Sequence, residues 1–227
     1  MKLSWRSELP QWIVISAMFG VAAWAWSRLP ARIPIHWNLH GKIDGYGGKG
    51  VGLLLLPLVT LGLYLLMRLM HLIDPGKANY EIFSRAFTAI RTALVLFMAA
   101  VYGASLLATF GHKVNMTTVV CFALAALFAV IGNFMGKIRP NWFVGVRTPW
   151  TLSSKMSWDK THRLAGWLFL AMALLIAALG TIQTTWMFIV MLVGNGACIL
   201  WMIVYSYLIY RDDPDRNSPP GASARSE

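Results

Sequence analysis

Two histidines and an aspartate recur at intervals of four residues in the segment IPIHWNLHGKIDGYGGKG, which covers residues 33–50. On a helix, His36, His40 and Asp44 would lie on one face, and imidazole and carboxylate groups are ligands that suit Zn²⁺. Pro34 and the glycines between residues 41 and 50 argue against a continuous helix here. A metal site at these residues would therefore be built from loop ligands.

Other interpretations of this segment need no metal. Catalysis is disfavoured because no serine or cysteine nucleophile pairs with a base, and no second carboxylate accompanies Asp44. In a structural interpretation, His36 and Asn38 satisfy backbone groups of the loop, and a turn forms at Asp44–Gly45. A rigid loop of this kind is also suited to recognising a partner.

Long apolar blocks surround this segment and must position it. Hydrophobic residues make up 57% of the 227 residues and charged residues only 13%, whereas a soluble domain has about 25% charged residues. The blocks are roughly 17 to 25 residues long, enough to cross a hydrocarbon core of about 30 Å, and too long for barrel strands. We therefore expect an all-α polytopic membrane protein with six transmembrane helices. The blocks are 11–27, 51–73, 92–111, 117–136, 164–182 and 186–210.

The distribution of basic residues predicts the orientation. Six transmembrane helices place both termini on one side of the membrane. Fifteen of the 20 Lys and Arg residues lie in or near the termini and the second and fourth connections, and five lie in the others. Positive charge stays in the cytoplasm, so we expect cytoplasmic termini and an outward-facing loop at 29–50. The net charge of +11 then favours anionic lipid head groups over direct nucleic-acid binding.

Three regions follow along the chain. Residues 1–73 are expected to form a two-helix membrane region with the structured external loop 29–50. Residues 74–210 form a four-helix region with a cytoplasmic loop at 137–163. Residues 211–227 are rich in Pro, Ser, Asp and Arg and are expected to form a disordered tail. The two cysteines fall inside apolar blocks, where a thiol is a small apolar side chain, and no cofactor is expected.

The loop at 137–163, KIRPNWFVGVRTPWTLSSKMSWDKTHR, mixes basic residues with three tryptophans. An interfacial belt, in which such residues anchor helix ends, would account for any one of them. Pro140, Gly145 and Pro149 punctuate the backbone at short intervals, which favours a defined cap over a slack linker. Because Pro149 fixes its own φ and pushes Thr148 away from helix, a turn of set shape is expected there.

The end of this loop predicts how the next helix begins. We expect Ser157 to be the N-cap, with Asp159 in the first turn. Trp158 and His162 would then share a face, four residues apart. The guanidinium of Arg147 can bind a carboxylate, either on a partner or on Asp159, and the internal pair would brace the loop.

Two stretches together resemble a known family. GN at 132–133, RPNWFVGVRTPWTLSS and SWDKTHRLAG resemble the signature of the SdpI family of Sdp toxin immunity proteins. LPARIPIHWNLHGKIDGYGGK resembles the small membrane domain that commonly precedes that signature, although His40 is not part of the pattern. The matching positions in the first loop are Pro34, His36, Trp37, Asn38, Gly41 and Asp44. Those in the second are Asn133, Pro140, Asn141, Gly145, Arg147, Thr148, Pro149, Trp150, Trp158, Lys160, His162 and Arg163.

The resemblance implies a multi-pass protein of the bacterial inner membrane, without enzymatic activity, that protects a cell from a secreted membrane-active toxin peptide. It also implies a receptor that holds a cytosolic transcriptional repressor at the membrane on toxin exposure. His36, Trp37, Asn38 and Asp44 are then candidates for a toxin-facing surface. The alternative is a small transporter or a metal-dependent membrane enzyme that uses the His/Asp loop.

Polar residues inside the apolar blocks raise a further question. Asn133 and Asn195 each follow a glycine. Glycine lets helices approach closely, and asparagine can hydrogen-bond across the contact, although a polar path for ions or peptide is the alternative. Asn133 is expected to brace the loop at 137–163. Arg68 and Arg91 lie near block ends, where long side chains are expected to snorkel to the interface.

Overall fold

The computed structural model describes residues 5–38, 40–182 and 186–216, and six long helices dominate this part of the chain. Each is long and apolar enough to cross a membrane, which confirms the expected all-α polytopic architecture. The helices are α1 (Trp5–Trp26), α2 (Lys49–Ile73), α3 (Ser84–Thr109), α4 (Met116–Met135), α6 (Lys155–Ile182) and α7 (Trp186–Arg211). The shorter elements are strands β1 (Arg32–Trp37) and β2 (Ile43–Gly48), the 3₁₀ helix η1 (Lys77–Glu81) and helix α5 (Pro149–Ser153).

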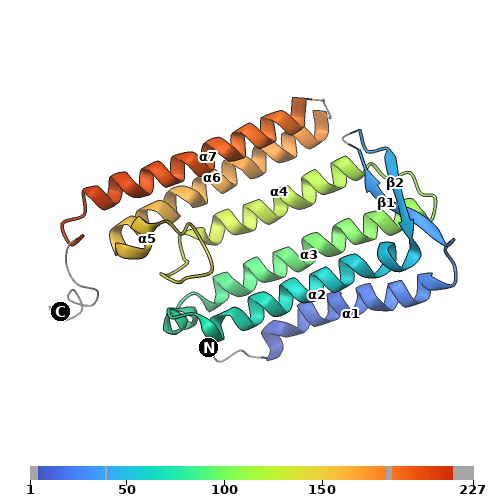
Figure 1. The fold of residues 1–227 in the computed structure, drawn as a ribbon, viewed down its shortest axis with the longest axis horizontal. Coiled ribbons are helices and arrows are strands. Elements are labelled where there is room, and N and C mark those ends of the chain that lie inside the picture. Colours follow the sequence, from blue (N-terminus) through green and yellow to red (C-terminus); the bar gives the residue numbers. More distant parts are fainter. Residues whose placement is uncertain (1–4, 39, 183–185, 217–227) are drawn as a thin grey trace.

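The long helices follow one another across the molecule in the order α1, α2, α3, α4, α6 and α7 (Figure 1). Helices α1, α2 and α3 pack on one another, α4 packs on α6, and α6 packs on α7, while the α3–α4 contact joins the two halves. The hairpin of β1 and β2 marks one end of the bundle, which we call the hairpin end. Helices η1 and α5 and the first and last described residues lie at the opposite end, which we call the motif end.

Helices α4 and α6 touch through their backbones. A Cβ on Gly132 would lie 2.8 Å from the carbonyl oxygen of Gly166, and one on Gly166 would lie 2.9 Å from that of Gly132. This confirms that the glycine before Asn133 allows close helix approach. Asn133 itself is exposed, and the side-chain amide of Asn195 donates to the carbonyl oxygen of Met191 in its own helix, at 2.8 Å.

Three helices begin more than two residues earlier than the apolar blocks indicate: α1 at Trp5, α3 at Ser84 and α6 at Lys155. The blocks mark only the hydrocarbon-crossing part of a helix, and polar turns extend beyond it. The expected N-cap at Ser157 is wrong, because the Ser154 hydroxyl oxygen accepts the Ser157 N–H at 2.9 Å, ahead of the first residue of α6. Residues 217–227 of the expected tail lie outside the described residues, and α7 continues to Arg211.

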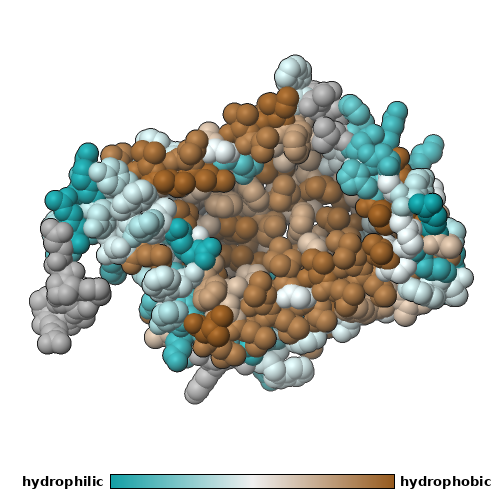
Figure 2. All heavy atoms as spheres, in the orientation of Figure 1, coloured by the Kyte–Doolittle hydropathy of each residue, from teal (hydrophilic) through white to brown (hydrophobic). Residues whose placement is uncertain are grey.

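Apolar side chains cover the outside of the bundle between its two ends. Figure 2 shows this on one face of the molecule, in the orientation of Figure 1. Hydrophobic residues fill the middle of that face, and hydrophilic residues gather towards the two ends of the bundle. Leu66, Trp167, Leu174 and Leu200 are among the exposed side chains. A soluble monomer with such an apolar surface would aggregate, whereas in a bilayer the same surface contacts lipid.

Candidate functional site

The outward-facing loop expected at 29–50 contains a β-hairpin, which the glycine-rich sequence did not predict. β1 pairs antiparallel with β2, from Arg32 opposite Gly48 to Trp37 opposite Ile43. The reversal follows Asn38, whose side-chain oxygen accepts the backbone N–H groups of His40 and Lys42 at 2.9 and 3.1 Å. Gly41 supplies the positive φ of 70° that this turn requires.

Two earlier expectations for this loop change as a result. The expected turn at Asp44–Gly45 is wrong, because both residues lie in β2. The structural role proposed for Asn38 is confirmed, since its side chain closes the reversal.

His36 and Asp44 form an exposed pair across the two strands. The Nδ1 atom of His36 lies 2.5 Å from a carboxylate oxygen of Asp44. His40 does not join them, and no group of three or more His, Cys, Asp or Glu side chains within the described ranges could hold a metal ion. The four-residue spacing that suggested a metal site therefore produces a pair of side chains on a hairpin. Because Asp44 holds Nδ1, the other ring nitrogen of His36 is the one available to a ligand.

Close glycine contacts join the two strands to each other and the hairpin to α2. A Cβ on Gly45 would lie 2.8 Å from the Cβ of His36, and one on Gly47 would lie 2.7 Å from the Cδ1 of Ile35. A Cβ on Gly52, in the first turn of α2, would lie 2.5 Å from the Cδ1 of Ile33. These positions have no room for a larger side chain, so Gly45 and Gly47 allow the two strands to pack closely, and Gly52 allows the hairpin to pack on α2.

Asn141 organises the first part of the loop at the motif end. This buried side chain makes four hydrogen bonds to the backbone. Its amide nitrogen donates to the carbonyl oxygens of Arg139 and Val144, at 2.9 and 3.0 Å. Its oxygen accepts the N–H groups of Phe143 and Val144, at 2.9 and 2.6 Å. One asparagine thus satisfies a non-helical backbone that would otherwise leave several buried polar groups unpaired.

His162 and Trp158 hold the second part of that loop on α6. The ring of Trp158 stacks on that of His162 at 4.0 Å, which confirms that the two share a face. Nε2 of His162 accepts the N–H of Val146 at 3.0 Å, and Nδ1 lies 2.9 Å from the carbonyl oxygen of Trp158. This pattern requires a neutral imidazole with its proton on Nδ1. Gly145, at φ 111°, lies over the ring, where a Cβ would collide with Nε2.

Thr148 and Pro149 begin helix α5. Thr148 is extended, as expected for the residue before a proline. The Thr148 hydroxyl accepts the N–H of Thr151 at 3.1 Å, and the Thr151 hydroxyl accepts the N–H of Thr148 at 2.9 Å. Pro149 is the first helical residue, a position that suits its fixed φ. The Thr148 hydroxyl also lies 3.0 Å from that of Ser206 in α7. The loop is therefore anchored to a helix more than fifty residues away in sequence.

The end of α7 supplies further contacts that sequence analysis missed. Ser157 donates to the carbonyl oxygen of Ser206 at 2.8 Å, and the hydroxyl of Ser154 donates to the carboxylate of Asp213. Trp150 packs against Tyr207 with ring centroids 5.2 Å apart. Nothing in the local sequence of α7 indicates this docking, because Ser206 has only apolar and aromatic residues on either side of it.

A second missed element is Asp74, the residue after α2. Its buried carboxylate accepts the Gly76 N–H at 2.6 Å, the Tyr80 hydroxyl at 2.8 Å and the Trp142 N–H at 3.1 Å. Burial, and then the hydrogen bond to Asp74, raise the pKa of Tyr80, so its hydroxyl stays protonated as a donor. The carboxylate therefore ties the connection between α2 and α3 to the loop at 137–148.

Arg147 does not pair with Asp159, so that expectation is wrong. Its guanidinium donates to the carbonyl oxygen of Trp142 at 2.7 Å and is exposed. Asp159 instead contacts Lys155 at 2.8 Å, its neighbour one helical turn away, and Arg139 at 3.9 Å. Arg147 braces the loop through a carbonyl, as a planar donor fork can.

The other residues of the second motif divide into an exposed set and a buried set. The carbonyl of Pro140 accepts the side-chain amide of Asn79 at 2.7 Å. Lys160 and Arg163 are exposed on α6. With Arg147 and Asn133, they form the part of the motif that faces outward from the folded loop. Trp158, His162 and Asn141 form the buried part.

A buried charge cluster joins α1, α2 and α3 near the motif end. The expectation that Arg91 snorkels is wrong: its side chain is 0% exposed and its guanidinium donates to the carboxylate of Glu8. Tyr64 also donates to Glu8, at 2.8 Å, and Arg68 lies 4.0 Å from it. The rings of Tyr64 and Phe87 flank the Arg91 guanidinium at 5.5 and 5.4 Å. Because the Glu8 carboxylate neutralises the Arg91 guanidinium inside the bundle, the side chain does not extend to the membrane–water interface.

Two separate family matches are found along the chain, and each includes one of the two loops. Residues 137–206 match the SdpI/YfhL protein family, and residues 13–61 match a domain of unknown function, DUF1648. The chain is 24% identical over 199 residues to the Immunity protein SdpI of Bacillus subtilis (strain 168), covering 88% of this chain and 93% of that protein. These matches confirm the resemblance drawn from the two motifs. No solved structure matches the chain.

Proposed function

We propose that this chain, in which an SdpI/YfhL region follows a DUF1648 region, is an immunity protein of the bacterial inner membrane. It protects the cell that carries it from a secreted membrane-active peptide. The observation that carries the proposal is the similarity to Immunity protein SdpI, which covers 88% of this chain and so is too long to involve one region alone. The six apolar helices support a multi-pass protein in contact with membrane lipids.

The two loops are assigned different tasks in this proposal. The hairpin faces outward and meets the peptide through His36, Trp37, Asn38 and Asp44. The motif end faces the cytoplasm, where exposed Arg147, Lys160 and Arg163 form a surface for a transcriptional repressor. The exposure of these basic side chains and the rigid bracing of their loop support that assignment. The protein performs no catalysis in this account.

Cysteine labelling tests the orientation. In a variant with Cys121 and Cys198 replaced by alanine, Lys42→Cys should react with a membrane-impermeant thiol reagent in intact cells. Lys155→Cys should react only after the membrane is opened. Both side chains are exposed, so protein burial does not decide the result. Labelling of Lys155→Cys alone in intact cells would reverse the orientation and the tasks of the two loops.

Survival of a sensitive bacterium tests the immunity function. Cells that express the wild-type protein should survive the secretions of a related peptide-secreting strain, and cells with an empty vector should not. His36→Ala and Asp44→Ala should each lower survival, because each removes one member of the exposed pair on the hairpin. Lys42→Ala is the matched exposed control and should protect fully. Full protection by both pair variants would remove the hairpin pair from the mechanism.

A further inference from the structure

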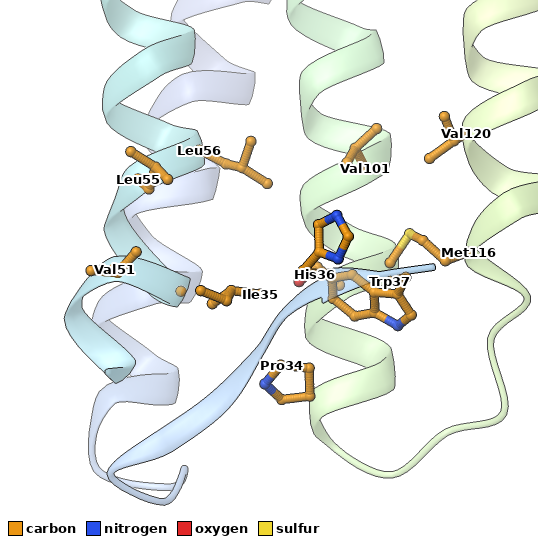
Figure 3. Close-up of a pocket in the computed structure, with 12 residues that line it drawn as sticks. Pro34, Ile35, His36, Trp37, Val51, Leu55, Leu56, Val101, Met116 and Val120 are labelled. Carbon is orange, nitrogen blue, oxygen red and sulfur yellow. The ribbon is translucent and has the colours of Figure 1, made fainter. Parts of the chain in front are cut away.

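Two cavities with largely apolar walls differ in the charge that they carry. One, of about 360 Å³, lies between β1 and helices α2, α3 and α4 (Figure 3), and the described residues that line it include no Lys, Arg, Asp or Glu. The other, of about 540 Å³, lies at the motif end and has Arg147 in its wall. Because a fixed charge selects a ligand of opposite charge, the second cavity indicates what it binds.

Four methionines line this second cavity, which we call the methionine groove. Met67 and Met70 belong to α2, Met202 belongs to α7, and the buried Met135 belongs to α4, the helix between those two halves of the bundle. Apart from one arginine and one threonine of the loop, the side chains that line the groove are apolar. Methionine is flexible and polarizable, so these walls can adapt to the shape of a hydrocarbon chain.

The methionine groove opens sideways, towards the lipid. Ile199 and Ile203 on α7 line it and are 53% and 39% exposed on the apolar outer surface of the bundle. The hydroxyl of Ser206, later in the same helix, lies 3.0 Å from that of Thr148 in the loop. Ile199 precedes Ser206 by roughly 10 Å along α7, at about 1.5 Å per residue. The groove therefore extends from the loop into the hydrocarbon region, and its occupant comes from the bilayer.

The loop closes the methionine groove at the motif end. All of Phe143–Thr148 line it, and the hydrogen bonds of Asn141 and His162 hold this backbone in place. A helix of a partner protein is about 10–12 Å across and would have to pass the loop to leave the membrane. A phospholipid ends at its head group, at the depth of the loop. The closed end therefore fits a lipid and disfavours a membrane-spanning helix.

Arg147 supplies a positive charge at that closed end. Its exposed guanidinium makes one hydrogen bond, to the carbonyl oxygen of Trp142, and has no carboxylate partner among the described residues. The described residues that line the groove include no Asp or Glu. A guanidinium with free N–H groups binds phosphate oxygens, and basic pockets between membrane helices bind anionic head groups. Trp142 is 55% exposed beside it, as is usual for tryptophan at head-group depth.

We infer that the methionine groove binds one anionic phospholipid from the leaflet at the motif end, with an acyl chain among the methionines and its phosphate on Arg147. The bound lipid joins the half of the bundle that contains α2 to the half that contains α7. This role goes beyond the proposed immunity function and does not depend on it. Lys160 and Arg163 do not line the groove, so they remain available to a cytosolic partner.

Photoreactive lipids test this with the purified full chain. One probe is phosphatidylglycerol with a diazirine in one acyl chain, and the other is phosphatidylcholine with the same chain. Each is added in trace amount to nanodiscs of equimolar phosphatidylglycerol and phosphatidylcholine that hold one copy of the protein, and mass spectrometry maps the label. We expect the phosphatidylglycerol probe to label residues 131–138 and 199–203 about tenfold more than the other probe, the preference that one charge-assisted hydrogen bond gives.

Matched variants separate the head group from the groove. Arg147→Ala should lower labelling by the phosphatidylglycerol probe to that by the phosphatidylcholine probe, whereas Arg85→Ala, which removes an exposed charge at the same end, should keep the preference. Ile203→Trp should lower labelling of the groove by the phosphatidylglycerol probe about tenfold, because the indole fills its mouth. Val204→Trp and Leu96→Trp, at lipid-exposed positions outside the groove, should label like the wild type. Unfolding temperatures check that each variant is folded, and Ile203→Trp tests the groove with the loop sequence unchanged.

Equal labelling of the groove by the two probes would show that Arg147 selects no head group and would overturn the inference. Label spread evenly over the outer surface, or unchanged labelling in Ile203→Trp, would overturn the site. Loss of groove labelling in larger nanodiscs that hold two copies would assign the groove to a second copy and overturn the lipid. None of these outcomes depends on whether the protein protects cells, so they are distinguishable from a failure of the proposed function.

Discussion

Replacing Glu8 with alanine should destabilise the protein by about 3–5 kcal/mol, the cost of leaving one partner of a buried ion pair without the other. Arg91 is fully buried, and Glu8 accepts hydrogen bonds from both Arg91 and Tyr64. Without the carboxylate, the guanidinium remains in an apolar interior between two aromatic rings. The measurement is the free energy of unfolding in detergent, by denaturant titration, compared with wild type.

The controls separate pairing from charge. Arg85→Met removes a positive charge from an exposed position of the same helix and should change stability by less than about 0.5 kcal/mol. The double variant Glu8→Leu with Arg91→Met should recover most of the loss, because apolar replacements leave no buried charge unpaired. If the double variant is as unstable as Glu8→Ala alone, the pair does not act as a unit.

Replacing Asn141 with alanine should detach the loop at the motif end. Four backbone hydrogen bonds are lost, and each buried group left without a partner costs about 1–3 kcal/mol, so we expect a loss of about 4 kcal/mol or more. Protease cleavage between residues 139 and 148 should rise, while the rest of the bundle stays folded. Limited proteolysis with mass spectrometry measures this.

Two variants sharpen that prediction. Asn141→Asp keeps the acceptor for Phe143 and Val144 but loses both donated bonds, so its cleavage should fall between wild type and Asn141→Ala. Asn133→Ala removes an exposed asparagine and should behave like wild type. Cleavage of Asn141→Ala at the wild-type rate would show that the loop is held by Trp158 and His162 alone.

Helix number was predictable because the thickness of the hydrocarbon core sets the length of each apolar block. The expected fourth block, 117–136, differs from α4 by one residue at each end. The first residue of each helix was less predictable. It depends on which nearby hydroxyl oxygen accepts a backbone N–H of the first helical turn. Ser154 and Ser157 are both plausible N-caps by type, and only the backbone path selects Ser154.

The candidate site was predictable only where its chemistry is local. Trp158 and His162 share a face because they are four residues apart, and Asn38 closes a turn with its own neighbours. Glu8 and Arg91 lie 83 residues apart, so no local pattern could join them. The segment DPG after the second apolar block does signal a turn, which could have drawn attention to Asp74.

The spacing of His36, His40 and Asp44 misled for a physical reason. Intervals of four residues align side chains only on a helix, whereas a hairpin brings residues together across the strands. The reversal after Asn38 therefore pairs His36 with Asp44 and leaves His40 out of the pair. The glycines of the segment first indicated an irregular loop, but Gly45 and Gly47 instead allow close packing of β2 on β1, where a Cβ would collide with His36 or Ile35.

The most direct test of the account is the membrane potential of intact cells during exposure to the secretions of a peptide-secreting relative, followed with a potential-sensitive dye. Cells that express the wild-type protein should keep their potential, while cells with an empty vector lose it. The lipid-facing control Leu96→Trp should protect as well as wild type, and His36→Ala should protect less. Equal loss of potential with and without the wild-type protein, at confirmed expression in the membrane, would contradict the proposal that this chain is an immunity protein.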